Sequence, residues 1–468
     1  VINTPTYAPI WDPEKPNQYN KNFYGVNIMN PMENLARQKN NKNKENRLIA
    51  SGAATISFLP NLKLKSSVAL DRRNGVSTTF LDPISTTDGR NSFGTASDNR
   101  NMNTVLVFDN ILTYNTNIKK HGIDVMAGSS YTKSDYTNSW INGSHFRDDK
   151  IQTLNAANKI SWDGTGTGAS QWAISSYFAR VSYNYDSKYM LTMNMRADGS
   201  SKLHPDHRWG IFPSFSAAWR ISSEKFMKDI TWIDDLKLRG GWGQTGNQSG
   251  IGDYSYLQRY NINRIPWFEE GNDHAVPGIS QANLRTSDLK WETTSQTNIG
   301  LDLTVLNNRL TFSMDYYYKK TTDMLMNVSL PAGAAATTSI TRNEGEMTNK
   351  GFEFAINSHN LTGEFSWDTD FNISFNKNEV LALSENQTAL LTAAQFDQNY
   401  NGQSSYIAKV GLPMGLMYGY VYEGTYKYDD FNKSGNSYSL KPGVAHYSTE
   451  TNTQPGMPKY KDLNGDGI

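Results

Sequence analysis

The feature that most limits what this chain can fold into is a two-residue alternation of apolar and polar side chains. At odd positions from 177 to 185 the side chains are apolar or aromatic: Tyr177, Ala179, Val181, Tyr183 and Tyr185. The positions between them carry Phe178, Arg180, Ser182 and Asn184, and the rhythm resumes over 189–197. Successive side chains of an extended strand point to opposite faces, so the pattern predicts strands with one apolar and one wet face.

The same alternation recurs along the chain. Further apolar faces are predicted over 209–219, 297–305, 310–318 and 365–375. The inner face of a β-sandwich would produce any one of these strands, so the alternation alone leaves sandwich and barrel open.

The connections separate these two folds. Short links are predicted near 59–61, 117–122, 186–188, 307–309 and 361–363, and long polar segments alternate with them at 81–100, 137–172, 246–292, 322–349 and 378–403. Two links fit less well. The link 199–208 is short, although it lies on the side of the sheet where the other connections are long. The link 222–235 is long, although it lies on the side of the short turns, and Ser222 or Ser223 is expected to begin a short helix in it. Alternating turns and long loops favour an all-β, antiparallel, up-and-down transmembrane barrel, incomplete, with about 13 or 14 strands.

The composition is compatible with a barrel and gives no sign of a nucleic-acid partner. The mean hydropathy is -0.62, and no stretch approaches the roughly 20 apolar residues of a membrane helix. A barrel needs an apolar residue only at every second position, so low hydropathy does not argue against a membrane. The 45 basic and 45 acidic residues cancel, and no nucleic-acid partner is expected.

Strand length and tyrosine placement support the membrane interpretation. Residues 310 to 318 make about eight steps of roughly 3.3 Å, which at a 45° tilt span ~19 Å of an apolar band about 25 Å tall. Ring side chains are expected to form membrane girdles at Tyr183, Tyr185, Tyr189, Tyr316 and Tyr318. The alternative is that tyrosines are simply common in strands.

Several long phrases resemble the barrel portion of SusC/RagA-type TonB-dependent outer-membrane transporters. They are Arg196–Lys202 (RADGSSK) with the RWGIFPSFSAAWRISSEKFMK that follows, Leu236–Gln248 (LKLRGGWGQTGNQ), Leu289–Met324, Asn349–Val380, 410–426 (VGLPMGLMYGYVYEGTY) and 455–467 (PGMPKYKDLNGDG). These phrases occur in order over most of residues 177–467.

The resemblance implies a barrel of 22 strands in the outer membrane of a Gram-negative cell. Such proteins import oligosaccharides or peptides, are capped by a SusD-like surface lipoprotein and are energised by TonB through an N-terminal region. That region, the plug domain and the last barrel strands have no counterpart in residues 1–468, so the chain is expected to be a barrel fragment. By this resemblance the chain is not an enzyme.

The whole chain, 1–468, is interpreted as a partial barrel domain. Residues 1–46 are expected to form a polar external loop, 47–426 strands and loops, and 427–468 a polar segment. That segment ends in the first half of a calcium-loop pattern with candidate ligands Asp462, Asn464 and Asp466. The bidentate Glu of such loops is missing, and Asn-Gly and Asp-Gly are also ordinary turn formers.

Candidate solute-binding residues come from two sources. Loop aromatics can stack on sugars or peptide side chains, and we single out Trp140, Trp172, Tyr254, Tyr256, Trp267 and Phe268. Lumen-facing Arg180, Arg196 and Asp198 are candidates for lining the path. The competing interpretation is that the aromatics pack the loops together or contact the lid lipoprotein, and that the charged groups only solvate a wet interior.

Three short motifs carry little weight. Gly241, Gly243 and Gly246 spell a dinucleotide fingerprint, but no helix is expected after them. Residues 222–225 read S-x-x-K without its companion motifs, and His204 with His207 lacks a third metal ligand.

The alternative functions left open are a secreted all-β protein that binds or degrades carbohydrate, and a passive porin. Sequence cannot show whether two carboxylates converge for acid and base catalysis. A plug and a TonB-binding segment upstream would exclude a passive pore.

Overall fold

The computed structural model describes residues 9–16, 18–20, 30–84, 86–161, 164–268, 275–330, 339–384, 387–393, 404–446 and 453–467. Contacts divide the chain into a first unit, Val1–Asn386, and a second unit, Gln387–Ile468. The first unit holds the large sheet, and each unit is described by itself below.

A 13-stranded antiparallel sheet makes up most of the first unit. Its strands are β1 (Lys42–Leu59), β2 (Leu62–Leu81), β3 (Thr95–Ile118), β4 (His121–Ser144), β5 (Lys159–Ile160), β6 (Gly166–Tyr185), β7 (Tyr189–Ser200), β8 (Trp209–Arg220), β9 (Ile233–Asn247), β12 (Glu292–Val305), β13 (Leu310–Ser329), β14 (Ser339–Thr362) and β15 (Ser366–Ala382). Each strand pairs with the next in this order, except that β5 pairs only with β4. The predicted all-β, up-and-down fold with about 13 or 14 strands is therefore confirmed, and no pairing of β1 with β15 occurs among the described residues.

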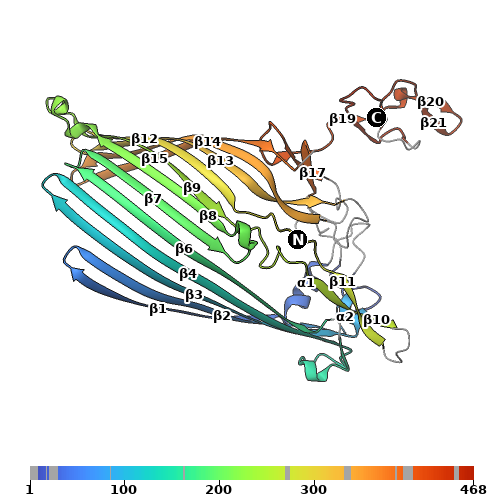
Figure 1. The fold of residues 1–468 in the computed structure, drawn as a ribbon. Coiled ribbons are helices and arrows are strands. Elements are labelled where there is room, and N and C mark those ends of the chain that lie inside the picture. The colour runs from blue at the N-terminus through green and yellow to red at the C-terminus, as the bar shows by residue number, and fades with distance from the viewer. Residues whose placement is uncertain are drawn as a thin grey trace. The chain divides into compact units, whose positions relative to one another are not determined.

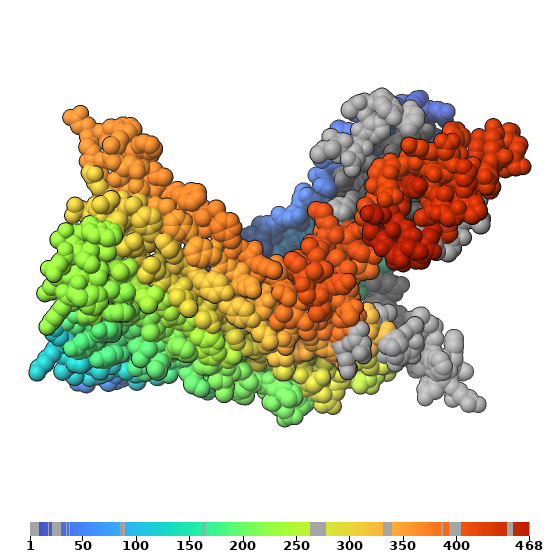
Figure 2. Space-filling view, turned by 90° about the horizontal axis from the view of Figure 1, so that it is seen from above, coloured from blue at the N-terminus to red at the C-terminus, as the bar shows by residue number. Residues whose placement is uncertain are grey.

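Figure 1 shows the sheet strands side by side, with the short turns at one end and α1, α2 and the β10–β11 hairpin at the other. In Figure 2 the surface colour passes from green through yellow to orange without interruption, as expected when neighbours in sequence are neighbours in space. The hairpin consists of β10 (Tyr260–Phe268) and β11 (Ala275–Gln281), outside the large sheet.

Within the part of the chain that the structure describes, helices are few and short. They are α1 (Pro31–Gln38), α2 (Thr87–Ser92) and the 3-10 turns η1 (Leu154–Ala156), η2 (Pro205–His207), η3 (Ile221–Ser223), η4 (Lys225–Met227) and η6 (Tyr428–Asp430). Asn30 caps α1 by accepting a hydrogen bond from the Met32 amide at 3.0 Å. Among the described residues, no helix combines the length and apolarity needed to cross a membrane.

The described residues of the second unit form three small antiparallel sheets. They pair β16 (Ala389–Ala393), β17 (Ser404–Lys409) and β18 (Leu416–Met417); β19 (Tyr422–Thr425) and β22 (Pro458–Tyr460); and β20 (Phe431–Ser434) and β21 (Ser437–Leu440). The contact boundary at Asn386 falls inside the predicted strand region 47–426, and β1 begins at Lys42, so it takes up the last five residues of the predicted loop 1–46.

The short and long connections alternate as expected, but the long ones are shorter than their polar composition suggested. β13 runs to Ser329 and β14 begins at Ser339, so most of the predicted loop 322–349 is strand. The loop predicted at 137–172 likewise shares residues with β4 and β6. Paired strands keep their hydrogen bonds beyond the apolar band, where outward residues turn polar and the alternation disappears from the sequence.

The register places the alternating residues on two continuous faces. Val181, Met193 and Phe215 stand opposite one another on β6, β7 and β8, and their side chains are 46%, 53% and 51% exposed. Their neighbours Arg180, Asn194 and Ser214 form the matching row on the other face. We call the first the outward face and the second the lumen face.

Charged residues mark where the outward apolar band ends on the loop side. The outward run of β2 gives way to Arg72 after Leu70, and that of β4 to Lys133 after Tyr131. On β13 the change comes at Lys320, which pairs with Glu346 at 2.9 Å. The predicted girdle residues Tyr316 and Tyr318 therefore lie at the loop-side limit of the band.

The other predicted girdle residues lie at the turn side. Tyr185 stacks on Tyr189 at 6.3 Å between ring centroids, and Tyr189 stacks on Trp219 at 6.5 Å. Trp209, stacked on Tyr177 at the loop side, shares β8 with Trp219, and their separation of about ten steps gives ~23 Å of height at a 45° tilt. These placements agree with two girdles about one apolar band apart.

The Asp186–Ser187 turn between β6 and β7 has positive φ at both residues, 53° and 55°. Two left-handed central residues are the type I′ geometry that matches the twist of a hairpin.

The long turn between β8 and β9 is held by one carboxylate. Glu224 accepts hydrogen bonds from the Tyr189 hydroxyl at 2.7 Å, the Lys188 ammonium at 3.2 Å and the Trp219 indole at 3.3 Å. Tyr189 and Trp219 are outward residues, so the turn folds against the outer side of the wall. The link holds two short 3-10 helices, η3 and η4, but the predicted start at Ser222 or Ser223 is wrong. The Ser222 hydroxyl donates to Asp235 at 2.7 Å instead of capping a helix.

We expect Met193→Arg to destabilise the sheet by about 2–4 kcal/mol, because it places a charge near the middle of the lipid-facing band. Ser216→Arg, on the lumen face of the next strand, is the control and should cost far less. The measurement is urea unfolding of the full-length protein in bilayers, followed by heat-modifiable gel migration. Equal losses for both variants would contradict the face assignment.

Stability should fall in acid through Glu224. Hydrogen bonds from Tyr189 and then Lys188 hold the pKa of Glu224 below its ordinary 4.5. A lowered folded-state pKa contributes stability that is present above pH 4.5 and is lost as pH falls through the folded value. Glu224→Gln should lack this slope in melting experiments from pH 7 to pH 3, whereas Asp229→Asn in the same turn should keep it. A wild-type slope in Glu224→Gln would exclude this role.

Candidate solute path and its external rim

The lumen face of β6 and β7 carries charges that are already paired within the wall. Arg180 donates to Asp124 at 3.2 Å, and Arg196 donates to Asp198 at 2.8 Å. Arg196 also donates to Ser176 at 2.9 Å and lies over the Phe178 ring at 5.4 Å. All three predicted lumen residues, Arg180, Arg196 and Asp198, therefore share one face, and each binds a neighbour in the wall.

A second lumen cluster, centred on Arg239, was missed by sequence reasoning. Arg239 on β9 donates to Asp302 on β12 at 3.1 Å and to Asp315 on β13 at 2.6 Å. Lys237 pairs with the same Asp302 at 2.8 Å. Arg239 reaches Asp315 two strands away because Gly300 stands between them in the register and has no side chain.

A signal for this cluster exists in the sequence. Gly300 falls on the lumen face of an otherwise regular strand, where a glycine often marks the close approach of another group. A Cβ at Gly300 would lie 2.5 Å from Arg239 Cζ and 2.7 Å from Asp315 Oδ1. Which charges meet over that glycine depends on strand register, which the local sequence pattern does not specify.

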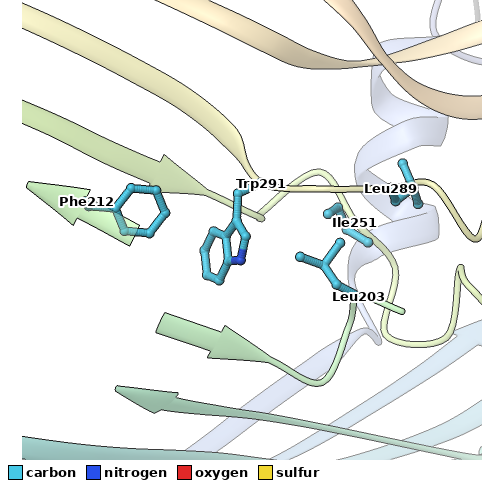
Figure 3. Packing of buried hydrophobic residues seen from close by; sticks show 5 residues of the cluster. All are labelled: Leu203, Phe212, Ile251, Leu289 and Trp291. Carbon is cyan, nitrogen blue, oxygen red and sulfur yellow. The ribbon is translucent and has the colours of Figure 1, made fainter. Parts of the chain in front are cut away.

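A cluster of buried apolar residues lies at the loop-side end of the lumen face. Leu203, Phe212, Ile251, Leu289 and Trp291 form a cluster in which every member is buried. Figure 3 shows Phe212 on its strand and the other four converging from the connecting segments. The Trp291 indole meets the Phe212 ring edge-on at 5.6 Å and donates to the Arg208 carbonyl at 3.0 Å. We call this the rim cluster.

Three predicted aromatics lie around the rim cluster. Trp172 on β6 receives the Lys202 ammonium over its ring at 5.6 Å. Lys202 pairs with Asp253 at 3.0 Å and donates to the Ile251 carbonyl at 3.2 Å. Lys202 thereby connects the loop between β7 and β8 to the loop between β9 and β10, beside the Trp172 ring.

The tyrosines complete this arrangement. The Tyr254 hydroxyl accepts from the Gln171 amide at 3.0 Å, and Tyr256 meets His204 edge-on at 6.1 Å between ring centroids. Trp172, Tyr254 and Tyr256 therefore belong to one rim of strand ends and folded loops. The expectation that they bind solute stays a prediction.

The remaining predicted aromatics do not join the rim. Trp140 lies on β4 with its ring against Gly166 of the paired strand. Trp267 and Phe268 lie in β10, and their side chains fall outside the described residues.

The calcium-like loop is organised by its own backbone. Asp462 accepts from the amides of Gly465 at 2.7 Å and Gly467 at 2.9 Å, and Asn464 donates to Asp466 at 2.7 Å. The backbone N–H groups of Gly467 and Gly465 lower the pKa of Asp462. Within the described parts of the chain, no three His, Cys, Asp or Glu side chains are grouped to hold a metal, and calcium at Asp462, Asn464 and Asp466 stays a prediction.

The glycine fingerprint and the paired histidines have structural explanations. Gly246 lies within β9 beneath the Phe212 ring, where a Cβ would approach to 2.1 Å. His204 accepts from the Asp206 amide and contacts Arg285 at 3.3 Å. Neither arrangement resembles a nucleotide or metal site.

A curved wall with an apolar outer face and a polar inner face defines a transmembrane β-barrel. The family model described as "TonB dependent receptor-like, beta-barrel" matches residues 3–456, and the chain belongs to this family. As predicted, it is therefore a protein of the outer membrane. The prediction that it is not an enzyme is also confirmed, because the relatives are receptors and transporters, and the secreted carbohydrate-degrading alternative is set aside.

Similar proteins support the same family. A TonB-dependent receptor of Formosa agariphila is 35% identical over 81% of this chain and 34% of its own length. The TonB-dependent receptor SusC of Bacteroides thetaiotaomicron is 31% identical over 86% of this chain and 40% of its own length. A solved structure of the RagAB peptide transporter superposes with a TM-score of 0.74 at 22% identity, covering 94% of this chain and 46% of that one. The chain thus spans less than half the length of these proteins.

Gly300→Val should destabilise the wall, because its side chain would displace the Arg239 guanidinium and leave Asp302 and Asp315 without their partner. The expected loss is about 2–4 kcal/mol, in the range for breaking a partly buried charge network. Gly240→Ala is the control, since a Cβ there meets only the Asn298 carbonyl oxygen at 3.6 Å. Unfolding in urea measures both, and a Gly300→Val protein as stable as the control would contradict the Arg239 bridge.

Proposed function

We propose that this chain forms the wall of a TonB-dependent importer that takes up oligosaccharides or oligopeptides across the outer membrane. Family membership supports the transport class. The observation that carries the solute class is the lumen wall itself, where Arg180, Arg196 and Arg239 are each neutralised by carboxylates of the same wall.

Paired wall charges suit a polar oligomer of low net charge. A wall with unpaired charges of one sign would concentrate ions of the opposite sign. Paired groups instead offer hydrogen-bond donors and acceptors along the path without a strong field. Hydroxyls of a sugar chain or amides of a peptide match such a surface.

The rim supplies the second element of the proposal. Trp172 lies at the loop-side end of the lumen face, and its ring is braced by Lys202. An aromatic ring fixed at the entrance of a polar path can stack on a sugar ring or on a peptide side chain. Tyr254 and Tyr256 on the folded loop extend the same aromatic surface.

The proposed partners follow from the relatives. SusC and the RagAB transporter are similar proteins, and we infer that a SusD-like surface lipoprotein covers the loop side of this barrel. TonB would act through a region outside residues 1–468. The competing function is a passive pore, which needs neither partner.

Uptake by cells that express the full-length receptor with its lipoprotein tests this proposal. Labelled neutral oligosaccharides and oligopeptides are supplied separately, with and without TonB. Import of either class that stops without TonB is expected. Import that continues without TonB would favour the passive pore, and failure of both solute classes would overturn the solute assignment.

Trp172→Ala should weaken apparent solute affinity about 2- to 10-fold, the equivalent of losing one stacking contact. Trp209→Ala is the matched control, because this loop-side tryptophan lies on the outward face. Affinity is measured from the concentration dependence of uptake. Identical affinities in both variants would remove Trp172 from the solute site.

A further inference from the structure

An apolar groove of about 530 Å³ lies on the outward face, near the turn end of β7, β8, β9 and β12. Its outward lining includes Tyr183, Leu191, Ala217, Trp219, Leu238 and Gly240. We call it the outward groove. Its volume lies in the range of sites that hold small ligands.

The groove exists because two small residues interrupt a wall of large ones. Ala217 and Gly240 are register partners on β8 and β9, between Leu191 on one side and Ile299 on the other. A Cβ at Gly240 would meet nothing closer than the Asn298 carbonyl oxygen at 3.6 Å. The space above Ala217 and Gly240 is therefore not filled by neighbouring side chains.

The mouth of the groove lies at the membrane boundary. Tyr189 and Trp219, which belong to the turn-side girdle, also line the groove. Both donate hydrogen bonds to Glu224, which pins the turn between β8 and β9 against the outer side of the wall. The residues that follow Glu224 are thus held beside the groove at the level of the girdle.

That turn has the composition of a membrane-surface segment. Phe226 and Trp232 are 64% and 58% exposed. Lys225 and Lys228 are exposed and have no ion-pair partner within the described residues, whereas Lys188 is paired with Glu224. Exposed rings beside free ammonium groups are typical of segments that lie at the lipid headgroups.

We propose that the outward groove and this turn bind one anionic phosphoglycerolipid of the inner leaflet. One acyl chain lies over Ala217 and Gly240, and the lipid phosphate lies between Lys225 and Lys228. The inference rests on outer-membrane location and on the short turns facing the periplasm, and it is independent of the solute that is imported.

A lipid fits these observations better than a second copy of the chain. The site combines a recess for an apolar chain with cations placed at the girdle, which is where a lipid phosphate lies. A second copy would present its own Lys225 and Lys228 near this surface only at a cost in repulsion. Contact between copies is accordingly treated as an outcome of the test.

The experiment is native mass spectrometry of the detergent-purified full-length receptor, titrated with dioleoyl-phosphatidylglycerol or dioleoyl-phosphatidylcholine. Wild type should retain one phosphatidylglycerol more tightly than phosphatidylcholine. Gly240→Leu should lose this lipid, because the new side chain fills the floor of the groove. Lys225→Gln with Lys228→Gln should weaken phosphatidylglycerol binding about fivefold per lysine and leave phosphatidylcholine unchanged.

Gly52→Leu is the control, because Gly52 is an outward glycine of β1 where an added Cβ would meet nothing within 4 Å. It should keep the lipid. Ala217→Val is a second groove-filling variant, and heat-modifiable migration confirms that each variant is folded. Undiminished phosphatidylglycerol binding by both folded groove variants overturns the proposal, as does a groove variant that changes from dimer to monomer with lipid binding intact.

Discussion

Backbone hydrogen bonding in lipid is the constraint on which the rest of this structure depends. A strand inside the apolar band has no water to bind its N–H and C=O groups, so each must pair with a neighbouring strand. Between β1 and β15 the sheet does so through a continuous series of antiparallel neighbours, and the outer edges of these two strands have no partner among the described residues. The two faces and the charged lumen both follow from that continuous register, because it aligns side chains of like kind across many strands.

The same register explains how a polar interior is built without isolated charges. Arg196 and Asp198 are two residues apart on one strand and share a face, whereas Arg239 reaches partners on two further strands. Gly300 is essential to the second arrangement because it leaves room for the guanidinium to cross. The wall therefore combines local and long-range pairing, and both neutralise arginines that face the solute path.

Much of this could be predicted from sequence because alternation is a local property. The outward faces of β6, β7 and β13 follow from period-two patterns, and the turns follow from residues such as Asp186 and Ser187. The Arg239 cluster could not be predicted, because it joins residues 63 and 76 positions apart whose meeting depends on register. The polar ends of β13 and β14 were mistaken for loop, because above the apolar band a strand no longer needs an apolar face. The rim was found only in part: Trp172, Tyr254 and Tyr256 were singled out, but the packing of Leu203 and Ile251 that positions the loops depends on tertiary contacts.

Ala217, Ala218, Gly240 and Gly241 have a consequence beyond the outward groove. A second recess, of about 350 Å³, lies on the lumen face of these same residues and reaches Lys237 and Arg239. Here the two recesses lie back to back, and little more than a single layer of backbone separates them. The small side chains at this patch leave the wall thin, so the low-dielectric lipid lies close to the arginine network at this point. The electrostatic environment of the inner path is thus set partly by material outside the protein, at a place where bulkier residues would have insulated one side from the other.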